Sequence, residues 1–201
     1  GLNGKNIISS KGALHYLTLT EIKKNHYYLV DKINKSKEQI LLVLGGPNKY
    51  YKYDKKNLSR IFENIKALAE KNNLQIIIIP SMRTPADTIE YANKFFGSEN
   101  LVVQNVDKKA YLSGLSIAKF LVVTCDSTSM ISEAAITGKP VYIAMMKSNK
   151  NNRRFKKFYS LLTDLGITRE LKNSVEEWSY ESLNEVNKIA PIIKTKMKTN
   201  G

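Results

Sequence analysis

Residues 122–144 read VVTCDSTSMISEAAITGKPVYIA, and the order of residue types in this stretch decides the fold. An apolar run that ends at Cys125 is followed by four small polar residues at 126–129, and then by apolar residues at helical spacing. Gly138 ends the predicted helix and Pro140 opens a second apolar run. A strand, a helix and a second strand in this order predict a βαβ unit with parallel strands.

The same alternation starts near residue 39. We predict strands at 39–46, 74–80, 99–105, 120–125 and 140–145, with helices at 57–71, 84–96, 108–120 and between the last two strands. The second of these helices is expected to start with Thr84 as N-cap and Pro85 in the first turn. Short apolar runs that alternate with longer helical patterns are typical of a sheet covered on both faces. The predicted fold class is therefore α/β, a Rossmann-like parallel sheet flanked by helices.

The two ends of the chain do not follow this alternation. Residues 1–38 contain a predicted strand at 13–19, and we interpret them as the end of an upstream domain or a connecting segment, since the chain begins with Gly rather than Met. Residues 39–180 form the predicted Rossmann-like nucleotide-binding domain. Residues 181–201 form a C-terminal helical segment, in which Pro191 is expected to cause a break or a kink.

The composition limits the class of protein and its partners. Lys and Arg number 32 against 18 Asp and Glu, which gives a formal charge of +14. This surplus predicts salt-sensitive attraction to a polyanion, although a compositional bias toward Lys, Asn and Ile is the favoured explanation of the charge. No nucleic-acid-binding motif accompanies the 11 tyrosines, so nucleic acid is the partner that the sequence favours least.

Cysteine content and hydropathy point to a compartment. A single cysteine excludes a disulfide framework and a Cys-rich metal site. No apolar run approaches the roughly 20 residues that a membrane span needs, and the first residues resemble no targeting segment. We therefore expect a cytoplasmic protein, with peripheral contact to a membrane as an open alternative.

Three loops after predicted strands have unusual content, at 45–54, 80–85 and 125–130, and ligands of open parallel sheets bind at this edge. Gly45 and Gly46 follow the first strand and let the backbone approach a ligand closely. Ser81 and Arg83 follow the second strand, and an arginine there can grip a phosphate or carboxylate through two hydrogen bonds. A plain turn and a surface arginine are the alternative explanations.

The loop after the fourth strand is the most specific of the three. Either Asp126 or Ser127 caps the following helix, so that Thr128 and Ser129 lie in its first turn, where hydroxyls and free amides suit a diphosphate. Glu133 lies one turn further along the same face and can accept hydrogen bonds from ribose hydroxyls. Capping alone needs only one of these residues. We therefore predict a site for a nucleotide-diphosphate sugar, with no metal and no tightly bound cofactor.

Four ordered motifs carry a family resemblance: GALH (12–15), LGGPNKYYKYD (44–54), PSMRTP (80–85) and VTCDSTSMISEAAITGKPVY (123–142). Together they resemble the family of the plant mitochondrial fission factor of the elongated-mitochondria type and its bacterial relatives. The last motif is also similar to the nucleotide-sugar-binding motif in the C-terminal domain of GT-B glycosyltransferases. The resemblance covers the chain from about residue 12 to residue 169.

The resemblance implies a GT-B-like pair of Rossmann-type domains, of which this chain is mainly the second. By position, the residues facing the nucleotide would be Gly45, Gly46, Ser81, Arg83, Asp126, Ser127, Thr128, Ser129 and Glu133. The missing N-terminal domain would supply the acceptor pocket and the catalytic base, so no catalytic residue is assigned and enzymatic activity stays open. The alternative is a non-catalytic adaptor at a membrane surface that recruits a protein partner, with the basic segment 147–157 meeting an acidic protein or an anionic membrane.

Overall fold

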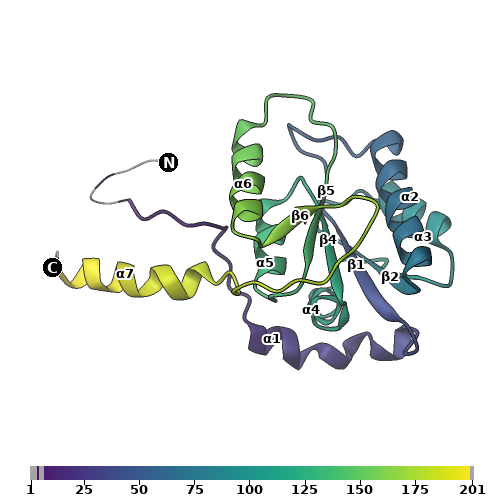
Figure 1. Cartoon of the computed structure of the whole chain (residues 1–201), viewed down its shortest axis with the longest axis horizontal. Helices are drawn as coiled ribbons and strands as arrows, with labels where there is room; N and C mark the ends of the chain where they lie inside the picture. The colour runs from purple at the N-terminus through teal and green to yellow at the C-terminus, as the bar shows by residue number, and fades with distance from the viewer. Residues whose placement is uncertain (1–3, 5–6, 200–201) are drawn as a thin grey trace.

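A wholly parallel sheet forms the centre of the computed structural model, which describes residue 4 and residues 7–199 (Figure 1). The strands are β1 (Glu38–Leu44), β2 (Leu74–Pro80), β3 (Leu101–Val102), β4 (Phe120–Thr124), β5 (Val141–Ala144) and β6 (Thr168–Glu170). Their spatial order is β3-β2-β1-β4-β5-β6, the order of the dinucleotide-binding Rossmann sheet. The predicted α/β, Rossmann-like class is confirmed.

Helices cover both faces of this sheet (Figure 1). Helices α2 (Lys55–Lys71) and α3 (Ala86–Phe96) lie on one face. The other face carries α4 (Lys108–Ile117), α5 (Thr128–Ala135) and α6 (Arg153–Asp164). Because both faces are covered, the central strands β2 and β4 are buried along their whole length, as their mostly apolar sequences indicate.

Helix α2 shows how the apolar pattern sets the packing. The residues at helical spacing are all buried: Leu58, Ile61, Phe62, Ile65, Leu68 and Ala69. Asp54 caps the helix by accepting a hydrogen bond from the Asn57 amide at 2.9 Å, so α2 starts at Lys55, two residues before the predicted start. Phe62 packs against the rings of Tyr91 and Phe96 on α3, with centroids 5.3 and 5.0 Å apart.

The segment before the sheet packs on α4 and α5. Helix α1 (Leu19–Lys24) and the 3₁₀ turn His26–Tyr28 lie against α4, and a second 3₁₀ turn, Val30–Lys32, follows. The predicted strand at 13–19 is wrong, because residues 12–18 run over α5 and not beside a strand. There the Ala13 amide donates to Ser132 Oγ at 2.9 Å. That residues 1–38 end an upstream domain stays a prediction, and residues 1–3, 5 and 6 lie outside the described residues.

Several element boundaries also differ from the prediction. The strand expected at 99–105 shrinks to two residues in β3, which pairs only with β2. Helix α3 begins at Ala86 with Pro85 as N-cap, because the Thr84 hydroxyl donates to the Leu44 carbonyl at 2.9 Å. Strand β6 was not predicted, since only its first residue is buried and its sequence shows no apolar run.

The C-terminal helix α7 (Glu185–Thr199) extends away from the sheet (Figure 1). It continues through Pro191, so the expected break does not occur. The last two residues of the predicted C-terminal segment, 200 and 201, lie outside the described residues. None of the helices in the described part of the chain combines the length and the hydropathy that crossing a bilayer requires.

Lys139 caps the carboxyl end of α4. Its ammonium donates to the carbonyl oxygens of Leu115, Ser116 and Ala118 at 2.9, 2.5 and 2.8 Å, and a cation at this end also complements the helix dipole. We expect Lys139→Met to lower the free energy of unfolding by about 1–2 kcal/mol in urea denaturation, because three carbonyls lose their donor. Lys24→Met, at an exposed position of α1, is the control and should cost under about 0.5 kcal/mol. Equal costs would contradict a capping role.

Candidate functional site

The loops after β1 and β4 meet at the point where the strand order reverses, which is where α/β sheets of this type bind ligands. The Gly45 amide donates to Thr124 Oγ1 and the Gly46 amide donates to Asp126 Oδ2, both at 2.9 Å. The loop after β2 joins them through Arg83. Three loops that are distant in sequence are thereby connected by direct hydrogen bonds.

Asp126 is the centre of this connection. Its side chain has no exposed surface and accepts hydrogen bonds from the Gly46 amide, from Arg83 Nη2 at 2.8 Å and from the Tyr53 hydroxyl at 2.6 Å. Arg83 Nη1 also donates to the Gly46 carbonyl at 2.9 Å, although 44% of the Arg83 side chain is exposed. The carboxylate is thus occupied by the protein's own donors.

The two glycines are required by the same close packing. A Cβ atom on Gly45 would lie 2.1 Å from Asp126 Oδ2, and one on Gly46 would lie 2.0 Å from the backbone oxygen of Arg83. The close backbone approach expected at these glycines therefore exists, but the partner is another loop of the chain. In this structure Gly45, Gly46, Arg83 and Asp126 come together as one network.

Tyr53 completes the network and was missed in the sequence, where it was only part of a tyrosine cluster beside the loop. Its hydroxyl lies 2.8 Å from Thr124 Oγ1 as well as 2.6 Å from Asp126. Burial, together with the neighbouring Asp126 carboxylate, raises the pKa of Tyr53 well above its usual value. The phenol therefore stays a donor at neutral pH.

Ser81 and Glu133 lie on the wall of a separate cavity of about 210 Å³ between α4 and α5, although the Ser81 hydroxyl also accepts a hydrogen bond from the Arg83 amide at 3.3 Å. The carboxyl ends of β1 and β2 close the cavity on one side. Its other lining residues are mostly apolar or aromatic: Tyr16, Leu17, Val43, Pro80, Met82, Val106, Asp107, Lys108, Tyr111 and Met130. An apolar cavity with a few converging polar groups is the usual form of a small-molecule site.

Glu133 is held in place by a second tyrosine. The Tyr111 hydroxyl donates to Glu133 Oε2 at 2.8 Å. Burial raises the pKa of Glu133, and the hydrogen bond from Tyr111 partly opposes that rise. Since a carboxylate has about four acceptor positions, Glu133 retains acceptors for a ligand in the cavity. Tyr111 was not predicted, because a tyrosine among apolar helix positions suggests core packing.

The first turn of α5 has the predicted form. Ser127 is the N-cap and accepts a hydrogen bond from the Met130 amide at 3.4 Å. Thr128 is half-buried and Ser129 is exposed. Within residues 7–199, no protein group bonds to either of these two hydroxyls. The turn therefore offers hydroxyls, unpaired first-turn amides and the positive end of the helix dipole.

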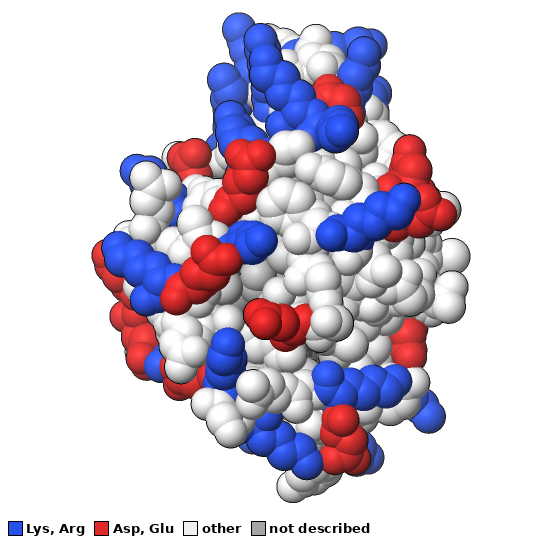
Figure 2. Space-filling model, turned by 90° about the vertical axis from the view of Figure 1, so that its right-hand side faces the viewer, with Lys and Arg blue, Asp and Glu red and all other residues white. Residues whose placement is uncertain are grey.

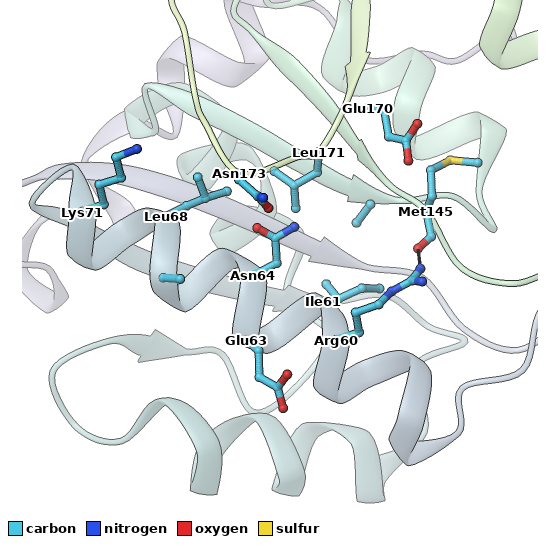
Figure 3. Close-up of a pocket in the computed structure, with 12 residues that line it drawn as sticks. Arg60, Ile61, Glu63, Asn64, Leu68, Lys71, Met145, Glu170, Leu171 and Asn173 are labelled. Atoms are coloured by element: carbon cyan, nitrogen blue, oxygen red, sulfur yellow. Dashed lines mark hydrogen bonds between the residues drawn. The ribbon is translucent and has the colours of Figure 1, made fainter.

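A larger cavity, of about 570 Å³, lies between α2 and the ends of β5 and β6 (Figure 3). Arg60 donates to the Met145 carbonyl at 2.7 Å, Asn64 points toward Asn173, and the Glu63 carboxylate points away (Figure 3). None of the residues predicted from the sequence lines this cavity. We place the candidate site at the smaller cavity, because the oriented Glu133 carboxylate lines it and lies one turn after the Ser/Thr-rich start of α5.

Two further kinds of chemistry, metal binding and attack by a thiol, depend on His, Cys, Asp or Glu side chains of the described residues. No three His, Cys, Asp or Glu side chains come together there as a group that could hold a metal ion. Cys125 is fully buried, and burial raises the pKa of its thiol to about 11. The thiol is therefore protonated at neutral pH and is a poor nucleophile.

The strand order, the helices on both faces and the loops at the carboxyl edge define a Rossmann-like α/β domain. The sequence profile of the Mitochondrial fission ELM1 family matches residues 1–197, and the chain belongs to this family. An uncharacterised protein of Rickettsia prowazekii is 30% identical over 96% of this chain and 56% of its own length. Mitochondrial fission protein ELM1 of Arabidopsis thaliana is 25% identical over 97% of this chain and 46% of its own length. The chain thus spans about half the length of these curated relatives.

Solved structures resemble the fold more distantly. UDP-GlcNAc 2-epimerase from Neisseria meningitidis, solved with UDP-GlcNAc bound, is 15% identical and has a TM-score of 0.47 over 90% of this chain and 42% of its own. The UDP-GlcNAc 2-epimerase of Methanocaldococcus jannaschii is also 15% identical, with a TM-score of 0.47 over 86% of this chain and 50% of its own. At these values the likeness is one of general architecture.

Proposed function

We propose that this chain is the nucleotide-sugar-binding part of a GT-B-like protein. One observation carries the proposal: Glu133, oriented by Tyr111, lines an apolar-walled cavity on the same helix whose first turn presents Thr128 and Ser129. A nucleoside needs an apolar wall for its base and an acceptor for its ribose hydroxyls. A diphosphate needs amides, hydroxyls and a positive dipole. Helix α5 carries candidate groups of both kinds, with the hydroxyls in its first turn and Glu133 one turn further on.

The proposed contacts follow from the charges and hydrogen-bonding groups at each place. The amides and hydroxyls of Thr128 and Ser129 would hold the diphosphate, and Glu133 would accept from the ribose. Ser81 supplies a further hydroxyl on the cavity wall. These groups stabilise a diphosphate leaving group without a metal ion. The groups that hold the acceptor and remove its proton are not assigned to this chain.

We expect Glu133→Ala to weaken binding of a nucleoside diphosphate by about 10–100-fold, because hydrogen bonds to a charged group contribute about 1.5–3 kcal/mol. Isothermal titration calorimetry with uridine, guanosine and cytidine diphosphates measures this. Glu63→Ala is the matched control, because it removes a carboxylate on α2 (Figure 3), and Glu63 is not among the residues that line the smaller cavity. If the unmodified chain binds none of the three, or if both variants bind as it does, the proposal fails.

A further inference from the structure

Ten exposed Lys and Arg side chains from two segments gather at the carboxyl edge of the sheet. We name this set the basic rim: Lys49, Lys52, Lys55, Lys56, Lys147, Lys150, Arg153, Arg154, Lys156 and Lys157. Figure 2 shows Lys and Arg crowded at the top of the molecule, where Figure 1 places the loops that follow β1 and β5. The fold thus combines two basic segments that lie almost 100 residues apart.

The two segments are fixed to each other. The Asn149 amide donates to the Tyr50 carbonyl at 2.8 Å, and Tyr51 forms an antiparallel bridge with Ser148. Below them the fully buried Tyr51 hydroxyl accepts from Asn152 Nδ2 at 2.7 Å and lies 3.2 Å from the Tyr159 hydroxyl. The basic rim is therefore a preformed surface, so little conformational entropy is lost when it binds.

The charge of the basic rim is not balanced within the protein. None of its ten side chains forms an ion pair within the described residues. Asp54 is the only acid in residues 47–57 and 147–157, and its carboxylate caps α2. The first turns of α2 and α6 carry Lys or Arg and no acid, so the positive ends of both helix dipoles add to the same potential. An anionic partner would remove this self-repulsion.

The chemistry of the basic rim narrows the class of partner. Residues 47–57 and 147–157 contain no exposed large apolar side chain, whereas protein interfaces depend on aromatic, aliphatic and Arg anchors. Tyr51 is buried and Tyr50 half-buried, so no aromatic platform is offered to single-stranded bases. Eight of the ten cations are Lys, a hydrated point charge suited to diffuse attraction more than to paired hydrogen bonds.

We propose that the basic rim docks this domain on an anionic lipid bilayer, through the charged headgroups and without insertion of apolar side chains. Each Lys or Arg near such a surface contributes about 1 kcal/mol, or roughly fivefold in binding. This inference goes beyond nucleotide binding and does not depend on it, because the basic rim shares no residue with the cavity of Glu133.

Vesicle co-sedimentation tests the proposal with a charge-reversed variant that is designed to keep the fold. Lys55→Glu, Lys56→Glu, Arg153→Glu and Arg154→Glu are combined, because acids in a first helical turn favour the helix and the variant should fold. The control combines Lys66→Glu, Lys109→Glu, Lys172→Glu and Lys194→Glu, which change the net charge equally at exposed positions elsewhere. Thermal unfolding of both variants confirms that they are folded.

We expect binding to phosphatidylcholine vesicles that contain about one third phosphatidylglycerol, and none to phosphatidylcholine alone. Binding should weaken steeply between about 50 and about 500 mM salt. The rim variant should lose at least about 100-fold in affinity and the control only a few-fold. Absent or salt-insensitive binding, or equal loss in both variants, would overturn the proposal. So would binding of duplex DNA by the basic rim without binding of vesicles, which would assign it to nucleic acid.

Discussion

Asp126→Ala is expected to lower the free energy of unfolding by about 3–5 kcal/mol, because it removes a fully buried carboxylate that accepts three hydrogen bonds. The variant leaves the Gly46 amide and the Tyr53 hydroxyl without the acceptor that they share. Each buried donor that loses its partner costs about 1–3 kcal/mol. Arg83 adds less, since its side chain is 44% exposed and water can solvate it. Urea denaturation followed by circular dichroism measures the change.

A matched carboxylate separates this effect from a general loss of charge. Asp31 also forms an ion pair, with Lys35 at 3.0 Å, but its side chain is 90% exposed. Asp31→Ala should cost less than about 0.5 kcal/mol, as exposed pairs of this kind do. Arg83→Ala, which leaves Asp126 two of its donors, should fall between the two. A cost for Asp126→Ala as small as that for Asp31→Ala would show that the three loops do not depend on this carboxylate.

Periodicity predicted most of the fold, because the central elements are buried in ways that the sequence must match. Strand β2 could be read from LQIIIIP, and α2 from apolar residues that all proved buried. The errors fall where contacts distant in sequence decide the structure. Residues 13–19 look like a strand, but the hydrogen bond from Ala13 to Ser132 places them over α5. Strand β6 exists because it pairs with β5, and no local pattern indicates it.

The candidate site could be predicted only in outline. The motif around residues 126–133 indicated a capped helix with hydroxyls in its first turn and an acid behind them, and the structure has Ser127 as the cap. Sequence could not show that Arg83 and Asp126 bind each other, because either charge alone is equally suited to an external partner. Tyr53 and Tyr111 were missed for the same reason: a tyrosine's hydroxyl partner is set by tertiary contacts.

The hydrogen bonds around Asp126 also bear on where a ligand would bind at the point between β1 and β4 where the strand order reverses. In a nucleotide-binding sheet, a glycine turn after the first strand commonly faces the phosphates. Here the Gly46 amide is bound to Asp126, and Arg83 covers the same place. The proposed diphosphate position therefore lies at the first turn of α5. The place beside the glycine turn is already occupied by the side chains of Asp126 and Arg83. A mutation at Gly46 should therefore change mainly the free energy of unfolding, and a mutation at Glu133 mainly the affinity for a nucleoside diphosphate.

Gly46→Ala is the sharpest test of that packing. The added Cβ would lie 2.0 Å from the Arg83 carbonyl oxygen and 2.3 Å from its carbon, both backbone atoms, so one loop must move. We expect the free energy of unfolding to fall by about 3 kcal/mol or more, at the upper end for overpacking, because the shift also strains the contacts of Asp126. This loss outweighs the roughly 0.4–1 kcal/mol that Ala gains over Gly through the unfolded state.

Gly166→Ala is the control for this substitution. A Cβ atom on Gly166 would meet no atom of the described residues within 4 Å, but the backbone φ there is +69°. Ala should therefore cost only about 1–2 kcal/mol, through backbone conformation alone. Urea denaturation of both variants gives the comparison, and the melting temperature provides a second measure. Gly46→Ala could also prove no more destabilising than Gly166→Ala. The loops after β1 and β2 would then be further apart, or more easily displaced, than the hydrogen bonds between Arg83 and Gly46 indicate. Glycine at position 46 would then be free to serve a ligand.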